Sequence, residues 1–331
     1  MTGGIVCAGN WIVDIVHTID SWPGKSELVT IRDEAVGVGG GAANVAMDLA
    51  AFATGLPVLP VGLIGTDLHG ATVRATCRAA GLPDRWLAET DLAPTAHTHV
   101  MSVPGDSRTF FYHPGTNDLL AEDQVPVENL AATGARIFYL GYVNLLGGLD
   151  RVDGTGSTGA ARLLARARAA GMMTCVDLVS AVTPHFAATV AAALPQTDTL
   201  FLNEIEAARA TGLPVASEDD LAGLLAAAQA LRAGGAGRVV LHTAALALWL
   251  DAEGAAWARP DPIDPAHIVS PLGAGDAFCA GVMFGLHHRW DAAQCLRLAH
   301  RAAAACLGNA TATAGMRQLA LLWPDHPPLE E

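Results

Sequence analysis

Short apolar segments alternate with alanine-rich helical segments along most of this chain, and no other feature constrains its fold as strongly. The apolar segments predict buried strands at Gly4–Ala8, Pro57–Gly65, Arg136–Leu140, Met172–Asp177, Thr199–Leu202 and Arg238–His242. The segments between them predict helices at Ala42–Ala53, His69–Ala80, Gly159–Ala170, Glu204–Thr211, Leu221–Ala233 and Ala292–Leu307. Strand–helix alternation of this kind is typical of a parallel sheet covered on both faces. We therefore expect an α/β fold with a doubly wound, mostly parallel sheet and helices on both of its faces.

Two segments, 12–38 and 96–116, interrupt this pattern with β character of another kind. Leu28–Val36 mixes apolar and charged positions, which suits a strand in a sheet that is exposed on one face. His97–Val103 and Arg108–His113 flank Pro104-Gly105-Asp106-Ser107, a sequence typical of a hairpin turn. We expect both segments to pair as a small β lid over the ligand crevice, while 1–11, 39–95 and 117–331 form the core domain.

The composition limits the partners that such a fold can have. Hydrophobic residues make up 51% of the 331 residues and charged residues 16%, which is typical of a globular protein. The formal net charge is −14 and Lys25 is the only lysine among 19 basic residues, so no basic stripe exists for a nucleic acid to follow. No uncharged apolar run is long enough for a membrane span, and no signal peptide precedes the first expected strand. We therefore expect a cytoplasmic protein without nucleic-acid or membrane partners.

The cysteines of the chain do not form a recognisable metal or disulfide pattern. They are Cys7, Cys77, Cys175, Cys279, Cys295 and Cys306. All six lie in apolar segments and none has CxxC spacing, so we expect reduced cysteines in the core.

The segment Ser270–Phe278 carries the strongest chemical signal in the chain. Its Gly273, Ala274 and Gly275 precede an apolar-periodic segment, so they predict a loop that enters a helix. The N–H groups at a helix start have no partners within the helix, and the helix dipole adds positive charge, so this turn can hold a phosphate. Asp276 beside such a pocket is explained if it accepts a proton from the group that attacks the phosphate. The alternative is an aspartate that only caps its helix.

A second glycine-rich segment, Gly37–Asn44, leads into the helix expected at Ala42–Ala53. It contains a G-x-G-x-x-A match, a feature of dinucleotide-binding proteins, but no acid closes the next apolar strand. It can also be a plain helix start. In a third interpretation, Gly40 and Gly41 let a small polyol lie against the backbone. Asn44 then hydrogen-bonds the polyol hydroxyls, because an amide both donates and accepts.

Other polar positions have both a structural and a functional interpretation. Asp14, close behind the first strand, is either a solvated loop carboxylate or a second clamp on substrate hydroxyls. Asn203 and Glu206 follow an apolar strand and nearly reproduce a helix capping box. In the functional interpretation, Glu206 lies near a hydrated Mg²⁺, which needs few protein ligands. Arg108 is either solvated on a hairpin or in contact with an acid or phosphate group of the substrate.

Taken together, these residues resemble the ribokinase-like carbohydrate kinases, also called the phosphofructokinase-B type. One family signature is similar to Gly39–Asn44 running on to Pro60–Gly70, and the other is similar to Leu272–Phe278. Asn203-x-x-Glu206 matches an internal motif of the family, and Asp14 matches its sugar-binding acid. The order and spacing fit from about residue 5 to residue 315, which is nearly the whole chain.

The resemblance implies an ATP-dependent kinase that phosphorylates an alcohol group of a sugar or a nucleoside. It implies an anion hole at Gly273–Gly275, Asp276 as the base and Mg²⁺ near Glu206. It also places Asn203, Thr243 and Ala244 on the nucleotide side of the site. Several members of the family pair through their lids, so we expect a homodimer formed lid to lid.

Two stretches depart from the pattern of that family. A glycine-containing turn that contacts nucleotide in the family corresponds here to His242–Ala247, with Ala244 and Ala247 at the two glycine places. An added methyl group can block close backbone approach, so nucleotide binding is open to question. Ser270-Pro271-Leu272 lacks the acid that helps to bind a monovalent cation, which argues against activation by potassium. We expect a sugar kinase; the alternatives are a nucleoside kinase, a ligand-binding pseudokinase and, more distantly, a nicotinamide-dependent dehydrogenase.

Overall fold

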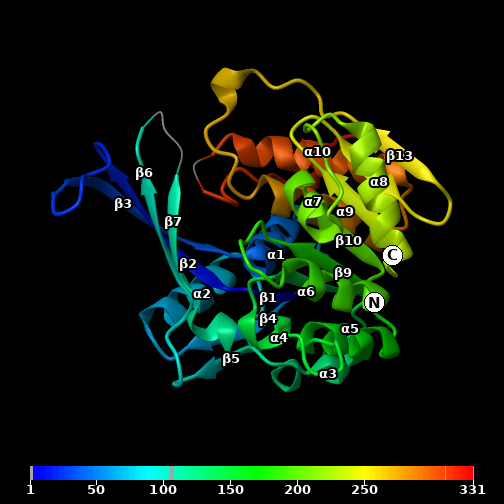
Figure 1. Cartoon of the computed structure of the whole chain (residues 1–331), viewed down its shortest axis with the longest axis horizontal. Helices are drawn as coiled ribbons and strands as arrows, with labels where there is room; N and C mark the ends of the chain where they lie inside the picture. The colour runs from blue at the N-terminus through cyan, green and yellow to red at the C-terminus, as the bar shows by residue number, and fades with distance from the viewer. Residues whose placement is uncertain (1–2, 105–107, 310, 331) are drawn as a thin grey trace.

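The computed structural model describes residues 3–104, 108–309 and 311–330, and its largest feature is a nine-stranded sheet (Figure 1). The strand order is β13-β12-β11-β10-β9-β8-β1-β4-β5. These strands are β1 (Ile5–Gly9), β4 (Val58–Gly65), β5 (Leu87–Thr90), β8 (Ile137–Val143), β9 (Met173–Leu178), β10 (Thr199–Leu202), β11 (Arg238–His242), β12 (Ala247–Leu250) and β13 (Ala255–Ala258). The seven strands from β5 to β11 are parallel, and β12 and β13 extend the sheet as antiparallel strands. The doubly wound, mostly parallel α/β fold is therefore confirmed.

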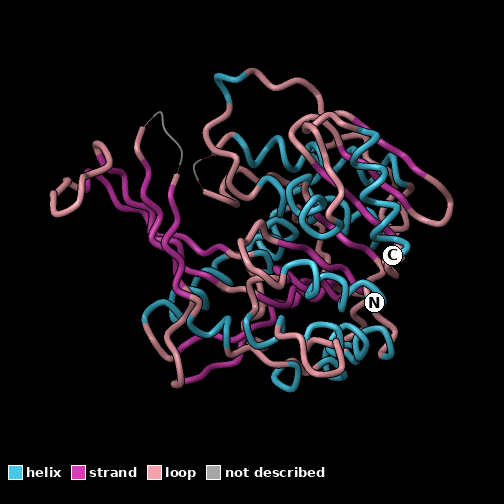
Figure 2. The backbone as a smooth tube through the Cα atoms, viewed as in Figure 1, coloured by secondary structure: helices cyan, strands magenta, loops and turns pink. Residues whose placement is uncertain are grey.

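Helices cover both faces of this sheet, and each face has its own apolar layer (Figure 2). The helices are α1 (Gly41–Ala51), α2 (Leu68–Ala79), α3 (Val127–Ala132), α4 (Gly147–Asp150), α5 (Gly159–Ala169), α6 (Phe186–Ala193), α7 (Glu204–Thr211), α8 (Leu221–Ala233), α9 (Ala274–His287), α10 (Ala292–Leu307) and α11 (Leu319–Leu322). Side chains of α1, α2, α9 and α10 form one layer, and those of α3, α5, α6 and α8 belong to the other. Because both faces are covered, a strand with neighbours on both sides, such as β4, is buried along its whole length, which explains its continuous apolar sequence.

A separate four-stranded sheet stands beside the core, on the left in Figure 1. Its order is β3-β2-β6-β7, with β2 at Ile12–Ile19, β3 at Ile31–Gly39, β6 at His97–Ser102 and β7 at Thr109–His113. The central pair β2 and β6 is parallel, and both edge strands are antiparallel to their neighbours. The turn expected at Pro104–Ser107 falls largely on residues 105–107, which lie outside the described residues. This sheet is the element for which we expected a lid role.

The C-terminal segment is attached to the core by aromatic contacts and hydrogen bonds. The ring centroids of Trp290 and Trp323 are 5.5 Å apart, and the Trp290 indole donates to the carbonyl of Pro328 at 3.2 Å. Leu319 begins α11 and its N–H donates to the carbonyl of Phe52 in the core. Among the described residues, no helix is both long and apolar enough to cross a membrane.

Candidate active site

The glycine-rich segment before α9 forms the sharp helix start that the sequence predicts. Gly273 precedes the helix with a φ of 80°, in the left-handed region that favours glycine. A Cβ atom at this position would collide with the carbonyl oxygen of Ala312. The helix begins at Ala274, whose N–H donates to the carbonyl of Pro271 at 3.3 Å, so Gly275 and Asp276 supply the first-turn N–H groups that have no partner within the helix. The local geometry therefore suits an anion beside a carboxylate.

Asp276 is the most constrained carboxylate of this region. It is only 5% exposed, and its Oδ2 accepts a hydrogen bond from the Asn44 side-chain amide at 2.8 Å. The hydroxyl of Tyr142 lies 2.8 Å from both of its oxygens. Burial raises the pKa of Asp276 to about 6, the two hydrogen bonds oppose that rise, and nearby Glu206 adds to it. Asp276 therefore combines a pKa near neutrality with a fixed orientation, which are the properties of a general base.

The close approach of α1 to β8 depends on the glycines that precede Asn44. Gly40 has a φ of 92°, and a Cβ atom there would lie 2.7 Å from the carbonyl oxygen of Asn10. A Cβ atom at Gly41 would lie 2.8 Å from the ring of Tyr142. These glycines thus let the protein pack against itself, and in doing so they bring Asn44 to Asp276.

Asp14 lies on β2 of the small sheet, next to the segment that leads into α1. It pairs with Gly37 across the strands, and a Cβ atom at Gly39 would collide with its carboxylate. Burial raises the pKa of Asp14 to about 6, and a hydrogen bond from Thr98 opposes that rise. Arg108 is half-buried and directly precedes β7 at the far edge of this sheet. The structure therefore brings Asp14, on the inner strand β2, to the glycine-rich segment, and it places Arg108 beside the edge strand β7.

Asn203 and Glu206 form the capping box that the sequence predicts at the start of α7. The Glu206 N–H donates to Asn203 Oδ1, and the Asn203 N–H donates to Glu206 Oε2, both at 2.9 Å. Glu206 is 4% exposed, and burial raises its pKa. Its other oxygen accepts from the Ser180 hydroxyl at 2.9 Å. Glu206 therefore caps the start of α7, and its carboxylate lines the same cavity as Asp276.

A cavity of about 240 Å³ joins these residues at the carboxyl edge of the sheet. Glu206, Asp276 and Gly275 line it, as do Asp177 at the end of β9 and His242 at the end of β11. Asp177, His242 and Tyr142 were not predicted to lie at the site. The available signal was the position of Asp177 and His242, the last residues of two expected strands, because sites of this fold class form at strand ends.

A larger cavity of about 550 Å³ opens on the other side of Gly275. Its lining is mostly apolar and includes Thr243, Ala244 and Phe278, together with Asn203. The Thr243 hydroxyl donates to the carbonyl of Glu218 at 2.7 Å and accepts from backbone N–H groups of its own turn, so it holds the shape of this wall. Among the described residues, Ala244 and Ala247 are not in the left-handed region, so the backbone here does not require glycine.

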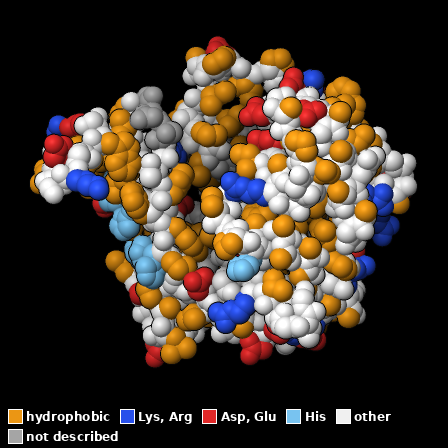
Figure 3. Space-filling model, in the orientation of Figure 1, with side chains coloured by type: hydrophobic (Ala, Val, Ile, Leu, Met, Phe, Trp, Pro, Cys, Tyr) orange, Lys and Arg blue, Asp and Glu red, His pale blue; other side chains and the backbone are white. Residues whose placement is uncertain are grey.

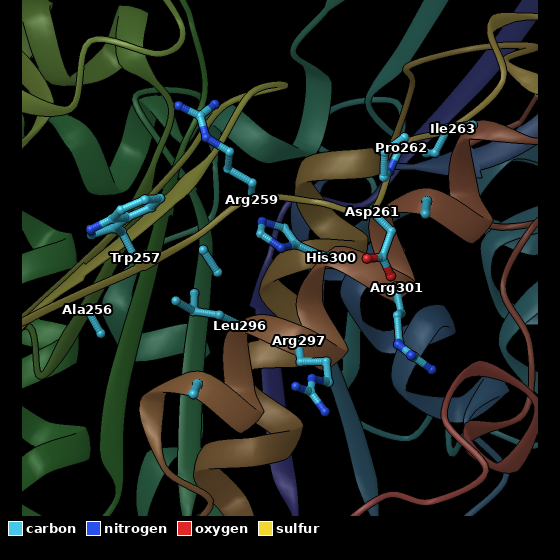
Figure 4. A pocket seen from close by; sticks show the side chains of 13 residues that line it. Ala256, Trp257, Arg259, Asp261, Pro262, Ile263, Leu296, Arg297, His300 and Arg301 are labelled. Carbon is cyan, nitrogen blue, oxygen red and sulfur yellow. The ribbon is translucent and has the colours of Figure 1, made fainter.

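A third cavity, of about 490 Å³, continues this groove along α10 and β13 (Figure 4). It shares Asp261 and His300 with the apolar cavity, and His300 lies between Trp257 and Asp261 in the view. The guanidinium groups of Arg259 and Arg297 point to opposite sides of it. The arginines therefore do not converge on one point, as an anion site would require.

The family model of the pfkB family carbohydrate kinases matches residues 3–319. The chain belongs to this family. The resemblance stated from the sequence is thereby confirmed, and the match includes both glycine-rich segments and both sheets of the structure.

Individual pfkB kinases are similar to this chain in different ways. The 1-phosphofructokinase of Escherichia coli K12 is 40% identical over 82 residues, which is 24% of this chain and a quarter of the relative's length. Ribokinase of Arabidopsis thaliana, solved with ribose and ATP, superposes with a TM-score of 0.80 at 20% identity, covering 98% of both chains. A fructokinase of Xylella fastidiosa with bound ATP gives a TM-score of 0.74 at 21% identity, again over 98% of both chains. At these identities the structural likeness shows the fold.

Proposed function

We propose that this protein is an ATP-dependent sugar kinase that transfers the γ-phosphoryl group of ATP to a hydroxyl of a small sugar. The observation that carries the proposal is the placement of Asp276. This buried carboxylate has a pKa near 6, adjoins the free N–H groups of a helix start, and is oriented by two hydrogen-bond donors. Membership of a carbohydrate kinase family and structural neighbours solved with sugar and ATP support it.

Asp276 acts as the general base in this proposal. At pH 7 a carboxyl group with a pKa near 6 is mostly ionised, so it can accept the proton of the attacking hydroxyl. The backbone N–H groups of Gly273–Gly275 stabilise the charge that develops on the transferring group. Asn44 and Tyr142 hold the carboxylate, so that its free lone pairs face the cavity.

The sugar lies between the small sheet and the core. Asp14 and Asn44 bind its hydroxyls while Gly40 and Gly41 bound the pocket, and Arg108 from the edge of the small sheet contacts an acidic or phosphate group if the sugar carries one. Figure 3 shows that the surface is hollowed between the small sheet and the core. The small sheet is then a lid, and its closure over the sugar excludes water from the transfer.

The nucleotide occupies the apolar cavity beside Thr243 and Ala244, with its phosphates toward Gly275. Mg²⁺ fits the residues at the junction, because Glu206 presents a buried carboxylate to the same small cavity as Asp276 and Asp177. Mg²⁺ keeps most of its waters and needs few protein ligands. When bound, it neutralises charge on the phosphate oxygens.

Two alternatives to a sugar kinase were left open by the sequence, a nucleoside kinase and a pseudokinase. A nucleoside kinase would use the residues named above in the same roles, and the structurally similar aminoimidazole riboside kinase of Salmonella enterica was solved with aminoimidazole riboside. The pseudokinase alternative was motivated by the added methyl groups of Ala244 and Ala247; their backbone conformations are ordinary, and ATP turnover tests whether the methyl groups block the nucleotide.

The proposal is tested by ATP turnover with matched panels of free sugars, sugar phosphates and nucleosides. We expect one sugar class to give the highest kcat/KM. Highest turnover of a nucleoside would replace the sugar kinase by its rival. Binding of sugars in a thermal-shift assay without any ATP turnover would support the pseudokinase instead.

A further inference from the structure

Three side chains with different metal-binding chemistry meet beneath the small cavity. Asp177 is the penultimate residue of β9, His242 is the last residue of β11, and Cys279 lies in the second turn of α9. Their possible ligand atoms all lie within 4.8 Å of one another. Asp177 is 4% exposed and Cys279 is fully buried. Asp177 and His242 also line the cavity that contains Gly275 and Asp276, so two of the three residues border it.

The carboxylate of Asp177 is held in position and still has capacity to bind. Its Oδ2 accepts from the Tyr139 hydroxyl at 3.2 Å, and its Oδ1 accepts from the N–H of Leu178 at 2.9 Å. Each carboxylate oxygen has two lone pairs, so both oxygens can accept a further ligand bond. A fixed carboxylate loses little conformational entropy when it coordinates an ion.

His242 is available as a neutral ligand. Burial lowers its pKa to about 4, so the ring is uncharged at pH 7 and one ring nitrogen keeps a free lone pair. The ring packs against Phe278, with centroids 5.0 Å apart, which limits its rotation. Its Cε1 would lie 3.1 Å from a Cβ atom at Gly275, so the ring borders the anion-binding turn directly.

The surroundings favour a cation. The carboxyl groups of Asp177, Glu206 and Asp276 all face this cavity, and none of the described residues that line it is lysine or arginine. A low-dielectric pocket with one sign of charge raises the local concentration of ions of the opposite sign.

We propose that Asp177, His242 and Cys279 form a binding site for a divalent transition-metal ion of the zinc type. One oxygen, one nitrogen and one sulfur ligand suit Zn²⁺, whereas Mg²⁺ selects oxygen ligands alone. Tetrahedral zinc holds its ligand atoms roughly 3.3–3.8 Å apart, so ligand atoms that lie within 4.8 Å of one another need to close by about 1.5 Å at most. The fourth position of the ion faces the cavity.

Metal binding displaces the protons that Asp177 and Cys279 carry, because burial raises the pKa of both groups. The Cys279 thiol gives its proton to the buffer as the sulfur–metal bond forms, so affinity increases with pH. The bound dication lies beside Gly275 and attracts the carboxylate of Asp276. Occupancy is therefore inhibitory for the proposed kinase reaction, although the site itself does not depend on that reaction being correct.

The test is a titration of the metal-free, full-length protein with Co²⁺, which replaces Zn²⁺ and reports its ligands by absorption. We expect one equivalent of Co²⁺ to produce a sulfur-to-cobalt charge-transfer band, and Zn²⁺ to remove it. The band should disappear in Cys279→Ser and persist in Cys77→Ser, a matched control because Cys77 is equally buried but lies on α2. His242→Gln should weaken Co²⁺ binding at least tenfold.

Each outcome decides the proposal. Cobalt binding without the charge-transfer band, or the same band in Cys279→Ser, would overturn it. If Cys279→Ser does not fold, the titration of His242→Gln decides, and wild-type affinity in that variant would overturn the site. The absorption readout needs no turnover, so a failed sugar-kinase assay and a failed metal titration are distinguishable.

Discussion

The hydroxyl of Tyr142 lies 2.8 Å from each carboxylate oxygen of Asp276. A hydroxyl has one proton, so it donates to one oxygen at a time and shares its bond between them. The Asn44 amide donates to one of the same oxygens from the opposite element, α1. Both donors stabilise the charged carboxylate, and both therefore keep the pKa of Asp276 below the value that burial alone would set.

Removing the Tyr142 hydroxyl should be visible in the pH dependence of turnover. A base must be unprotonated to act, so wild-type kcat should be full above the Asp276 pKa of about 6 and should fall about tenfold per pH unit below it. Tyr142→Phe should raise that pKa and move the acid limb to higher pH. We expect kcat at pH 6.5 to fall roughly 2–10-fold and to recover at pH 8.5. An equal loss at every pH would mean that Tyr142 contributes by packing alone.

The variant Asp276→Asn distinguishes a catalytic role of Asp276 as general base from a purely structural role as a helix cap. We expect kcat to fall roughly 10²–10⁴-fold, while binding of a nonhydrolysable ATP analogue changes little. The amide keeps an acceptor for Asn44 and Tyr142, so the variant should fold, which a thermal unfolding curve checks. A folded variant with full turnover would exclude Asp276 as the base.

Asp14→Ala tests the substrate clamp without touching the base. Loss of a buried hydrogen bond to a polar ligand costs about 1–3 kcal/mol, so sugar should bind roughly 5–150-fold more weakly. Nucleotide binding, measured by calorimetry on the same sample, should be unchanged. Equal weakening of both ligands would show that the substitution disturbs the fold.

Asp48 should make the protein less stable as the pH rises. It lies one turn after Asn44 on α1, is fully buried, and neither of its carboxylate oxygens has a hydrogen-bond partner among the described residues. Burial raises its pKa well above the ordinary value near 4, and the charge of Asp276 adds to this. Because the pKa of Asp48 is higher in the folded than in the unfolded protein, its contribution to the free energy of unfolding is fully present at low pH. Above pH 4 the free energy of unfolding declines by up to about 1.4 kcal/mol per pH unit.

Asp48→Asn should remove that decline. The melting temperature of the variant relative to wild type should therefore rise between pH 5 and pH 8. Asp20→Asn is the control, because Asp20 is exposed and its hydrogen bond with Arg32 lowers its pKa. A pH-independent difference for Asp48→Asn would contradict a protonated Asp48 in the native state.

The proposed lid-to-lid dimer makes a prediction about one face of the small sheet. Val36 and Phe111 lie on the face opposite Asp14, at cross-strand positions linked through Ile15 and His99, and they are 57% and 53% exposed. The ring of Trp22 contacts Phe111. The double substitution Val36→Asp and Phe111→Asp should convert a dimer to a monomer in light scattering. A wild-type monomer whose lid amides are protected from hydrogen exchange without ligand would refute both the dimer and a mobile lid.

Sequence reasoning worked where one local rule decided the structure. Thr199–Leu202 and Ala292–Leu307 have the bounds that were expected. The polar residues at the ends of a short apolar strand, and the capping residue before a helix, mark these bounds in the local sequence. The Asn203–Glu206 capping box was also predicted correctly from the local sequence. These signals need no knowledge of the neighbouring elements.

Residues whose roles depend on a distant neighbour were not predictable in the same way. Tyr142 is one aromatic residue in an apolar strand, and only the approach of α9 from 134 positions away makes it a partner of Asp276. The Asn44–Asp276 bond was likewise not foreseen, although both residues were selected individually. Strands β12 and β13 were not predicted either: the turn from β11 into β12, residues 243–246, has no glycine to mark it, although Gly254 lies in the turn between β12 and β13.

The chain leaves the core for the small sheet two residues after β1 ends, and it returns to the core one residue before α1 begins. Residues 12–39 are thus an excursion with neighbouring exit and entry points, and Asp14 and Asn44 lie on opposite sides of its return junction at Gly40. A segment with such junctions can be exchanged between relatives without altering the register of the large sheet. If the proposed function is correct, the substrate contact of Asp14 varies with that segment, whereas Asn44 and Asp276 stay with the core.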